Sequence, residues 1–486
     1  MAPSPERPLA LLAAAADGSS VRGDAATPVS GLRLRAQEVL PGDLFFCVPG
    51  RHADGHDFAP DALARGAVAL GVERPLDLDA PQLVVPSVRA AMGPIAAAFH
   101  GDPSRAFPLV GVTGTNGKTT VTYLLESILR TAGRETGLIG TTGVRIAGAP
   151  MPFPRTTPEA PDLQALLATM RARGVDAAVM EVSSHGLEQR RVDGTRFACA
   201  IFTNLTQDHL DHHGTMEAYF AAKALLFTDA FTAAAVVNVD DAYGRRLLGC
   251  IASTTTYAID VDADVRATDV ATTGEGSTFV ADGRIFRTAL RGRFNVENCL
   301  AAYAAARVLG IDPSVAVEGI AALRGVPGRV ETVEAGQPFL VLVDYAHTPD
   351  GIANVLRAAR PLATGRVLLV FGCGGDRDRA KRPRMGEAAT RDADLAIVTS
   401  DNPRSEDPLE IIAEIEPGAV AGGGAYVIEP DRRAAIRLAC AEARPGDVVV
   451  IAGKGHESGQ EFADRTIPFD DRAVAEEELR ALGVAS

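Results

Sequence analysis

Short apolar runs alternate along the chain with longer stretches in which apolar residues recur every three to four positions. The short runs have the length and composition of buried β-strands, and the longer stretches have helical periodicity. We expect strands at 67–72, 109–112, 176–180, 198–202, 339–343, 366–371, 395–399 and 448–451, and helices at 59–65, 119–131, 216–227 and 299–309. This alternation predicts an α/β protein with mainly parallel sheets.

Polar and charged residues follow directly after most of the apolar runs. They occupy segments 181–186, 203–214, 344–350, 372–378, 401–404 and 452–457. In a parallel α/β sheet, ligand-binding groups gather at the carboxyl ends of the strands. The sequence therefore predicts binding sites built from these six segments.

The segment 109–120 has the pattern of a phosphate-binding loop between a strand and a helix. Glycines at 111, 114 and 117 lead into Lys118 and Thr119. Such a loop lets backbone N–H groups surround phosphate oxygens, the lysine reach the terminal phosphates and the threonine hydroxyl bind Mg²⁺. The general pattern has a glycine where this chain has Val112, so the match is imperfect, but an ordinary strand–helix turn does not explain the whole run.

Composition sets the broad class of the protein. A chain of 486 residues with 47% hydrophobic and 23% charged residues predicts a globular protein of two or three domains. Turn-rich segments at 101–104 and 325–329 predict domains at 1–105, 106–326 and 327–486. The formal net charge of −14 argues against nucleic acid or an anionic membrane as the main partner, and no stretch has membrane-spanning length.

The six cysteines have no C-x-x-C spacing, so we expect them to be reduced thiols in the core of a cytoplasmic protein. The apolar segment 8–16 resembles a signal peptide faintly, and we expect it to be the first helix. The polar run 51–58 fits a binding loop and a solvated connection equally well.

Three features carry chemistry but leave alternatives open. The loop 203–214 holds His209, His212 and His213 beside amides and carboxylates, which suits a site at a strand end and also a polar surface loop. Lys223 shares a helical face with aromatic residues. It can reach water with its amine, or be buried with a lowered pKa and react with CO₂ to give a metal-binding carbamate. The amides of Asn295 and Asn298 could contact a nucleotide or cap a helix.

Motifs in a fixed order along nearly the whole chain resemble those of the Mur ligases, ATP-dependent amide-bond-forming enzymes of peptidoglycan precursor synthesis. They are segments 114–120, 181–186, 204–211, 344–350 and 453–457, together with Lys223, Asn295, Asn298 and Arg329. Segments 54–58, 156–158 and 374–378 resemble the ligases that add the third peptide residue. Segment 401–404 resembles the version that selects meso-2,6-diaminopimelate over L-lysine.

The resemblance implies a three-domain fold: an N-terminal uridine-nucleotide-binding α/β domain, a central P-loop ATPase domain with a mainly parallel sheet, and a C-terminal Rossmann-like domain. It implies that the enzyme adds meso-diaminopimelate to the D-Glu carboxylate of UDP-N-acetylmuramoyl-L-Ala-D-Glu through an acyl phosphate. ATP is then a cosubstrate, two Mg²⁺ sites are expected, and the enzyme is expected to be a cytoplasmic monomer.

The resemblance also implies roles for single residues. ATP would be bound by Gly114, Thr115, Asn116, Gly117, Lys118, Thr119, Thr120, Asn295, Asn298, Arg329 and Asp344. Metal would be held by Thr119, Glu181, His209 and Lys223, the last as N6-carboxylysine. The UDP-substrate would be bound by Thr156, Thr157, Ser183, Gln189 and Arg191. Diaminopimelate would be bound by Arg377, Asp401, Asn402, Arg404, Gly453 and Glu457. The catalytic set would be Lys118, Glu181, His209, Lys223, Arg329, Asp344 and His347, with the base that deprotonates the incoming amine left open.

One segment departs from the family pattern. Arg35-Ala36-Gln37 stands where many members have Asp-Ser-Arg, so Ala36 cannot make the uridine contact of that serine. Three other functions compete with the main expectation: an L-lysine-adding Mur ligase, a ligase similar to folylpolyglutamate synthetase, and a nucleotide-binding regulator without catalysis.

Overall fold

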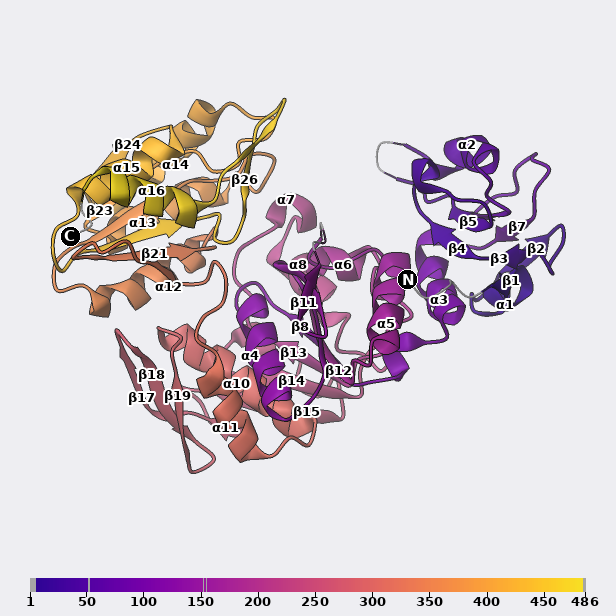
Figure 1. Cartoon of the computed structure of the whole chain (residues 1–486), viewed down its shortest axis with the longest axis horizontal. Coiled ribbons are helices and arrows are strands. Elements are labelled where there is room, and N and C mark those ends of the chain that lie inside the picture. Colours follow the sequence, from indigo (N-terminus) through magenta and orange to yellow (C-terminus); the bar gives the residue numbers. More distant parts are fainter. Residues whose placement is uncertain (1–5, 51–52, 152, 154, 484–486) are drawn as a thin grey trace.

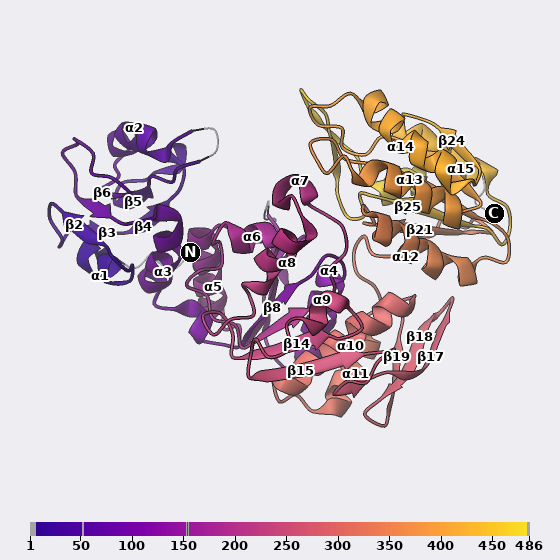
Figure 2. The same cartoon turned by 180° about the vertical axis from the view of Figure 1, so that it is seen from behind.

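The computed structural model describes residues 6–50, 53–151, 153 and 155–483, so Arg51 and His52 of the polar run 51–58 lie outside the described residues. Three sheet-centred units follow one another in chain order, with the middle unit between the other two (Figure 1). The view from behind shows the same succession (Figure 2).

The first unit is built on a five-stranded sheet of order β2-β7-β6-β5-β4, parallel except for β2. Its strands are β2 (Ser20–Arg22), β4 (Gly31–Arg33), β5 (Asp43–Phe46), β6 (Ala69–Val72) and β7 (Gln82–Val84), with a two-stranded sheet of β1 (Arg7–Pro8) and β3 (Pro28–Val29) beside it. Its helices are α1 (Leu9–Ala14), α2 (Ala59–Ala64) and α3 (Val88–His100), with 3₁₀ turns η1 (Ala36–Glu38), η2 (Gly55–Phe58) and η3 (Pro103–Arg105). Most of the apolar segment 8–16 thus lies in the first helix, as expected, with Pro8 in β1 before it.

The middle unit is a nine-stranded sheet of order β11-β10-β9-β12-β8-β13-β14-β15-β16. Its strands are β8 (Leu109–Thr113), β9 (Thr136–Gly140), β10 (Gly143–Ile146), β11 (Ala149–Met151), β12 (Ala177–Glu181), β13 (Cys199–Phe202), β14 (Ala234–Asn238), β15 (Ser253–Ala258) and β16 (Val265–Arg266). Only β10 runs against the other strands, so its pairings with β9 and with the edge strand β11 are antiparallel. A separate antiparallel sheet contains β17 (Thr268–Thr273), β18 (Gly276–Ala281) and β19 (Arg284–Thr288).

Helices cover both faces of the middle sheet, because its strands are apolar on both sides. They are α4 (Lys118–Thr131), α5 (Ala160–Ala172), α6 (Ser184–Glu188), α7 (Leu210–His213), α8 (Met216–Ala224), α9 (Ala242–Arg245), α10 (Arg293–Val308) and α11 (Pro313–Ala322). One core joins α4, α10 and α11 to the sheet, through residues such as Leu124 and Leu300. A second core on the opposite face takes in Leu167 of α5 and Phe220 of α8.

The last unit is a six-stranded sheet of order β20-β21-β25-β22-β23-β24, parallel except for β20. Its strands are β20 (Glu331–Val333), β21 (Leu340–Asp344), β22 (Val367–Phe371), β23 (Leu395–Val398), β24 (Tyr426–Ile428) and β25 (Val448–Ala452), and a hairpin adds β26 (Gly459–Glu461) and β27 (Thr466–Pro468). Its helices are α12 (Pro349–Ala359), α13 (Lys381–Asp392), α14 (Pro408–Gly422), α15 (Arg432–Glu442) and α16 (Asp471–Ala481), with a 3₁₀ turn η4 (Arg360–Leu362). Cores on both faces make this another doubly covered α/β layer.

The α/β class and the mainly parallel sheets are confirmed, and the expected strands lie within two residues of those observed. Three details differ. The helix expected at 216–227 ends at Ala224. Asn295 and Asn298 lie inside α10, whose N-cap is Gly292, so the helix-capping alternative is wrong. Cys250 is exposed, whereas the other five cysteines are buried free thiols.

Within the part of the chain that the structure describes, no helix has the length and apolarity needed to cross a membrane.

Candidate active site

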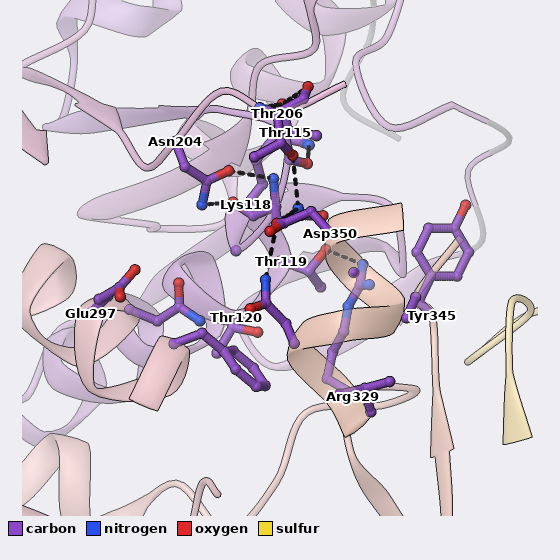
Figure 3. A pocket seen from close by; sticks show the side chains of 18 of the residues that line it. Thr115, Lys118, Thr119, Thr120, Asn204, Thr206, Glu297, Arg329, Tyr345 and Asp350 are labelled. Atoms are coloured by element: carbon purple, nitrogen blue, oxygen red, sulfur yellow. Dashed lines mark hydrogen bonds between the residues drawn. The ribbon is translucent and has the colours of Figure 1, made fainter. Parts of the chain in front are cut away.

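The phosphate-binding loop connects β8 to α4. Gly117, the N-cap of α4, has φ 88°, a left-handed conformation that favours glycine. A Cβ at Gly114 would lie 1.9 Å from Thr203 Oγ1, so the close approach of the two loops also requires glycine. The Lys118 Nζ donates to the carbonyl oxygens of Gly114 and Thr115 at 2.9 and 2.8 Å, which folds the lysine over the loop (Figure 3).

An acidic side chain faces the loop from the neighbouring strand. Glu181 ends β12, which pairs with β8, and its Oε1 accepts a hydrogen bond of 3.0 Å from the Thr119 hydroxyl. Arg329 Nη2 donates to the same hydroxyl at 3.0 Å, and its guanidinium lies 4.5 Å from the ring centre of Tyr345. A hydroxyl beside a carboxylate offers the oxygen ligands that Mg²⁺ prefers. The arrangement therefore fits a magnesium ion bound at the loop.

A cavity of about 650 Å³ opens over this loop. Of the residues expected to act, it is lined by Thr115, Asn116, Gly117, Lys118, Thr119, Thr120, Thr156, Glu181, Ser183, His209, Asn298, Arg329, Asp344 and His347. The last unit contributes Asp344 and His347 and the middle unit most of the others, so the cavity lies between two sheets. We call it the nucleotide cavity, because it contains the phosphate-binding loop.

Lys223 is buried, so the alternative in which its amine reaches water is wrong. Its side chain is 1% exposed, and Nζ donates to Gly114 O at 2.8 Å and lies 4.6 Å from the Tyr219 ring centre. Burial, together with the positive charge of Lys118, holds the pKa of Lys223 well below its usual range. Burial also lowers the pKa of Lys118, although Glu181 opposes this shift. This shift favours the neutral amine that carbamate formation needs.

A second, smaller cavity of about 170 Å³ lies against the last sheet. It is lined by all six residues expected to bind diaminopimelate, namely Arg377, Asp401, Asn402, Arg404, Gly453 and Glu457. These come from the carboxyl ends of β22, β23 and β25, as expected for a parallel sheet. We call it the amino-acid cavity.

Arg404 and Glu457, which line the amino-acid cavity, are paired with charged residues just outside its wall. Arg404 Nε donates to Glu461 Oε2 at 2.8 Å, and its Nη1 donates to Gly375 O at 2.9 Å. Asn402 Nδ2 donates to Glu457 Oε2 at 2.8 Å, and the buried Lys454 Nζ reaches the same oxygen at 3.1 Å. The cavity thus presents fixed cations and anions side by side, which suits a ligand that carries both.

The two cavities share Asp208, His209, Tyr345 and His347 in their walls. Asp208 Oδ2 lies 3.2 Å from His209 Nε2 and 3.5 Å from His347 Nε2, and Oδ1 lies 3.4 Å from Lys381 Nζ. Burial favours the neutral form of Asp208, but Lys381 and His347 outweigh it and hold its pKa well below the usual range. Burial lowers the pKa of His209 to about 2, so the imidazole is neutral and able to bind a metal. A ligand bound in the nucleotide cavity can therefore come into contact with a ligand bound in the amino-acid cavity at these four residues, which we call the junction.

Family models match three successive parts of the chain: "Mur ligase family, catalytic domain" at residues 28–100, "Mur ligase middle domain" at 112–306 and "Mur ligase, glutamate ligase domain" at 328–455. A UDP-N-acetylmuramoyl-L-alanyl-D-glutamate–2,6-diaminopimelate ligase of Geobacillus thermodenitrificans is 49% identical, over 92% of this chain and 94% of that one. The ligase of the same name from Streptomyces avermitilis is 48% identical, over 98% and 99%. A solved structure of a ligase with this name superposes with a TM-score of 0.68 at 35% identity, covering 95% of this chain and 97% of the other.

The chain belongs to the Mur ligase family. In this Mur ligase the residues expected to bind the UDP-substrate form one connected group. Thr157 Oγ1 donates to Glu181 O at 3.0 Å and accepts from Ser183 N at 3.0 Å. Arg191 donates to Thr157 O at 3.1 Å and to Gln189 Oε1 at 2.6 Å. This group adjoins the nucleotide cavity, whose wall includes Ser183 and Thr156.

The two asparagines of α10 are brought together with the loop. Asn298 Nδ2 donates to Asn295 Oδ1 at 2.9 Å, and the Asn298 Oδ1 would lie 2.4 Å from a Cβ at Gly117. Asn298 lines the nucleotide cavity, whereas Asn295 and Gly114 do not. Asp344 accepts hydrogen bonds from Val330 N and Ala346 N, both at 2.8 Å, and so fixes the segment beside Arg329.

Sequence reasoning missed four residues of this Mur ligase site: Tyr345, Lys381, Lys454 and Glu461. Lys454 lies in segment 453–457, in which only Gly453 and Glu457 were expected to bind a ligand. Its burial beside Asn402 and Glu457 depends on the tertiary fold. Lys381 begins α13 and has no local motif. Its contact with Asp208 joins the start of α13 to a loop 173 positions earlier in the sequence.

Proposed function

We propose that this Mur ligase joins meso-2,6-diaminopimelate to the D-Glu carboxylate of UDP-N-acetylmuramoyl-L-Ala-D-Glu, with ATP as cosubstrate. The observation that carries the proposal is the pair of cavities that share Asp208, His209, Tyr345 and His347. One cavity contains a phosphate-binding loop and the other contains paired charges. The names of the relatives at 48–49% identity support the same substrates.

The first step transfers the γ-phosphoryl group of ATP to the D-Glu carboxylate and gives an acyl phosphate with ADP as the leaving group. Negative charges must approach each other here, and Lys118 and Arg329, which both line the nucleotide cavity, offset their repulsion. Thr119, Glu181, His209 and the carbamate of Lys223 have the ligand atoms to hold two Mg²⁺ ions, with Glu181 and His209 serving the one nearer the carbamate. When bound, Mg²⁺ neutralises charge on the phosphate oxygens.

In the second step the neutral amine of diaminopimelate attacks the acyl carbonyl, the amide bond forms and phosphate leaves with the electron pair of the broken C–O bond. Arg404 and Arg377 suit the carboxylates of this ligand, and Glu457 suits an ammonium group. His347 lies at the junction with Nδ1 2.8 Å from Tyr345 O, which fixes the ring so that Nε2 faces Asp208. This placement makes His347 a candidate for holding the amine proton.

The same proposal assigns residues 1–105 to the uridine-nucleotide domain, 106–326 to the ATPase domain and 327–486 to the amino-acid domain. Thr156, Thr157, Ser183, Gln189 and Arg191 then bind the sugar-dipeptide part of the substrate, and Ala36 leaves one uridine contact of the family unmade. The enzyme acts as a cytoplasmic monomer.

A ligation assay with defined omissions tests the proposal. Phosphate release should require ATP, the UDP-muramoyl-dipeptide and diaminopimelate together, and the product should have the mass of the tripeptide precursor. Equal use of L-lysine would favour the lysine-adding ligase. Extension of a folate substrate would favour the folylpolyglutamate synthetase-like enzyme, and phosphate release without either substrate, or no release at all, would favour a regulator.

A further inference from the structure

A cluster of imidazoles and one carboxylate lies outside the two cavities. Glu188 comes from α6, and His212 and His213 come from α7. One ligand atom from each lies within 4.8 Å of the other two, and this is the one group of three or more metal-ligating side chains with such spacing among the described residues. We call these three side chains the α6–α7 cluster.

The ring nitrogens of the cluster converge on one carboxylate oxygen. His212 Nε2 lies 2.8 Å from Glu188 Oε2, and His213 Nδ1 lies 3.3 Å from the same atom. Ligands bound to one zinc ion at about 2.0–2.2 Å are spaced by only a few ångströms, so small side-chain shifts would suffice to bind an ion.

A neighbouring hydroxyl fixes the orientation of one ring. His213 Nε2 lies 2.9 Å from Ser184 Oγ, so a proton on Nε2 leaves the lone pair of Nδ1 directed at Glu188. Metal-ligating histidines usually have their second nitrogen hydrogen-bonded in this way. The His213 side chain is 1% exposed and its ring stacks on Tyr219 with centroids 5.0 Å apart, which holds the nitrogen in place.

We infer that Glu188, His212 and His213 form a site for a zinc-class transition-metal ion, separate from the magnesium sites. Two imidazoles and one carboxylate suit Zn²⁺ or Co²⁺, whereas Mg²⁺ prefers oxygen ligands alone. The Glu188 side chain is 49% exposed, so water has access to complete the coordination.

The site would join two short helices that flank the active site. The helix α6 follows directly after Ser183, in the wall of the nucleotide cavity, and α7 follows directly after His209, in the wall of both cavities. Each residue of α7 as a whole is at least partly exposed, and its most buried side chains are the imidazoles of His212 and His213, so little apolar packing holds that helix in place. An ion bound between α6 and α7 would therefore reduce the motion of the segment that positions His209.

Cobalt binding to the untagged full-length protein tests the inference. Metal is first removed with a chelator, and Co²⁺ is then titrated in excess Mg²⁺, which occupies the oxygen-rich sites. We expect one Co²⁺ per chain with the visible absorption of a low-coordinate imidazole site, competition by Zn²⁺, and a higher unfolding temperature with Zn²⁺ than without it.

Three variants separate the site from other histidines. His212→Phe keeps a flat ring against His185, and Glu188→Gln changes an exposed side chain and should fold in any case. Each should weaken Co²⁺ binding by about tenfold to a hundredfold or more. His100→Phe removes a half-buried histidine of α3 and should bind Co²⁺ like the wild type. Absence of Co²⁺ binding to the wild type, or equal binding to the wild type and Glu188→Gln, would overturn the inference.

Discussion

The two cavities handle charge in opposite ways. At the nucleotide cavity, Lys118 in its wall and the buried Lys223 beside it both donate to the carbonyl oxygen of Gly114, so two amines lie close together. In the amino-acid cavity, Arg404 is paired with Glu461, and Lys454 with Glu457. The first arrangement suits a ligand with many negative charges, and the second suits a zwitterion with fixed positions for each charge.

The difference shows where each cavity obtains its affinity and its selectivity. Amines crowded by burial have lowered pKa values, and a polyphosphate or carbamate relieves that unfavourable state. Side chains that are already paired gain less binding free energy from an arbitrary ion. They disfavour a ligand whose charges do not match the positions of the paired cation and anion. We therefore expect changes in the nucleotide cavity to alter the rate for every amino acid, and changes in the amino-acid cavity to alter the choice between amino acids.

The largest effect is expected from Lys223→Ala, which should abolish nearly all ligation. The variant removes the amine that forms the carbamate, and a short carboxylic acid should restore part of the activity by filling the vacated space. Glu217→Ala, an exposed change on the same helix, is the matched control and should keep wild-type activity. Full activity of Lys223→Ala would show that the amine does not form the metal-binding carbamate.

Next in size is the effect of His209→Ala on turnover. We expect kcat to fall by roughly 10²–10³, as for loss of one group that stabilises developing charge, with a much smaller change in ATP affinity. Steady-state kinetics and equilibrium binding of ATP separate the two quantities. Unchanged kcat with weakened ATP binding would contradict the assignment of His209 to the metal.

Arg404→Ala should change the choice of amino acid rather than the general rate. Wild type should prefer meso-diaminopimelate, because its second carboxylate can bind the Arg404 guanidinium, which L-lysine leaves paired with Glu461 alone. The preference should fall by about a hundredfold or more, measured as the ratio of kcat/KM values. Arg465→Ala, an exposed arginine on the nearby β26–β27 hairpin, should leave the ratio unchanged. A preference that survives in Arg404→Ala would assign the selectivity to another residue.

A smaller, uniform effect is expected from Lys381→Met at the junction. The change removes the ammonium group 3.4 Å from Asp208 and leaves that buried carboxylate with histidines alone. We expect kcat/KM for meso-diaminopimelate and for L-lysine to fall together by about tenfold, the size of one lost charged hydrogen bond of about 1.5 kcal/mol. The exposed Arg384→Met on α13 is the control. A change in the ratio between the amino acids would show that Lys381, which lines the amino-acid cavity, acts on the choice of amino acid rather than through Asp208.

The strand ends and the phosphate-binding loop could be predicted from the sequence because each depends on a local pattern. The order of glycines before Lys118, and the apolar run before Glu181, define their surroundings over a few residues. The residues of segment 401–404 were placed through the family resemblance, and the structure brings Asn402 beside Glu457.

Other features depend on packing between distant segments and have no local signal. The helical pattern around Lys223 fits an exposed amine as well as a buried one, and only the approach of the Gly114 loop decides between them. The α6–α7 cluster likewise forms only because Glu188 and His212, 24 positions apart, face each other. The pairing of Arg404 with Glu461 requires the β26–β27 hairpin to fold back over segment 401–404.

The smallest effect concerns acid stability beside the nucleotide cavity. Burial, helped by His212, His213 and Arg191 and opposed by Glu188, lowers the pKa of His185 to about 4. The unfolded chain, with an ordinary histidine pKa near 6.5, binds more protons between about pH 6.5 and pH 4, so the free energy of unfolding falls as the pH drops through this window. In the metal-free protein, His185→Phe should make this fall less steep in urea unfolding. An unchanged slope would show that His185 titrates normally.

Transfer of a labelled oxygen tests most directly the claim that one cavity activates a carboxylate and the other supplies the amine. The substrate is UDP-muramoyl-dipeptide with a heavy oxygen isotope in the reacting D-Glu carboxylate, incubated with ATP, Mg²⁺ and meso-diaminopimelate. The account predicts that each released phosphate carries one labelled oxygen and that the labelled precursor gains one diaminopimelate. Unlabelled phosphate, or labelled phosphate without an amide product, would contradict it.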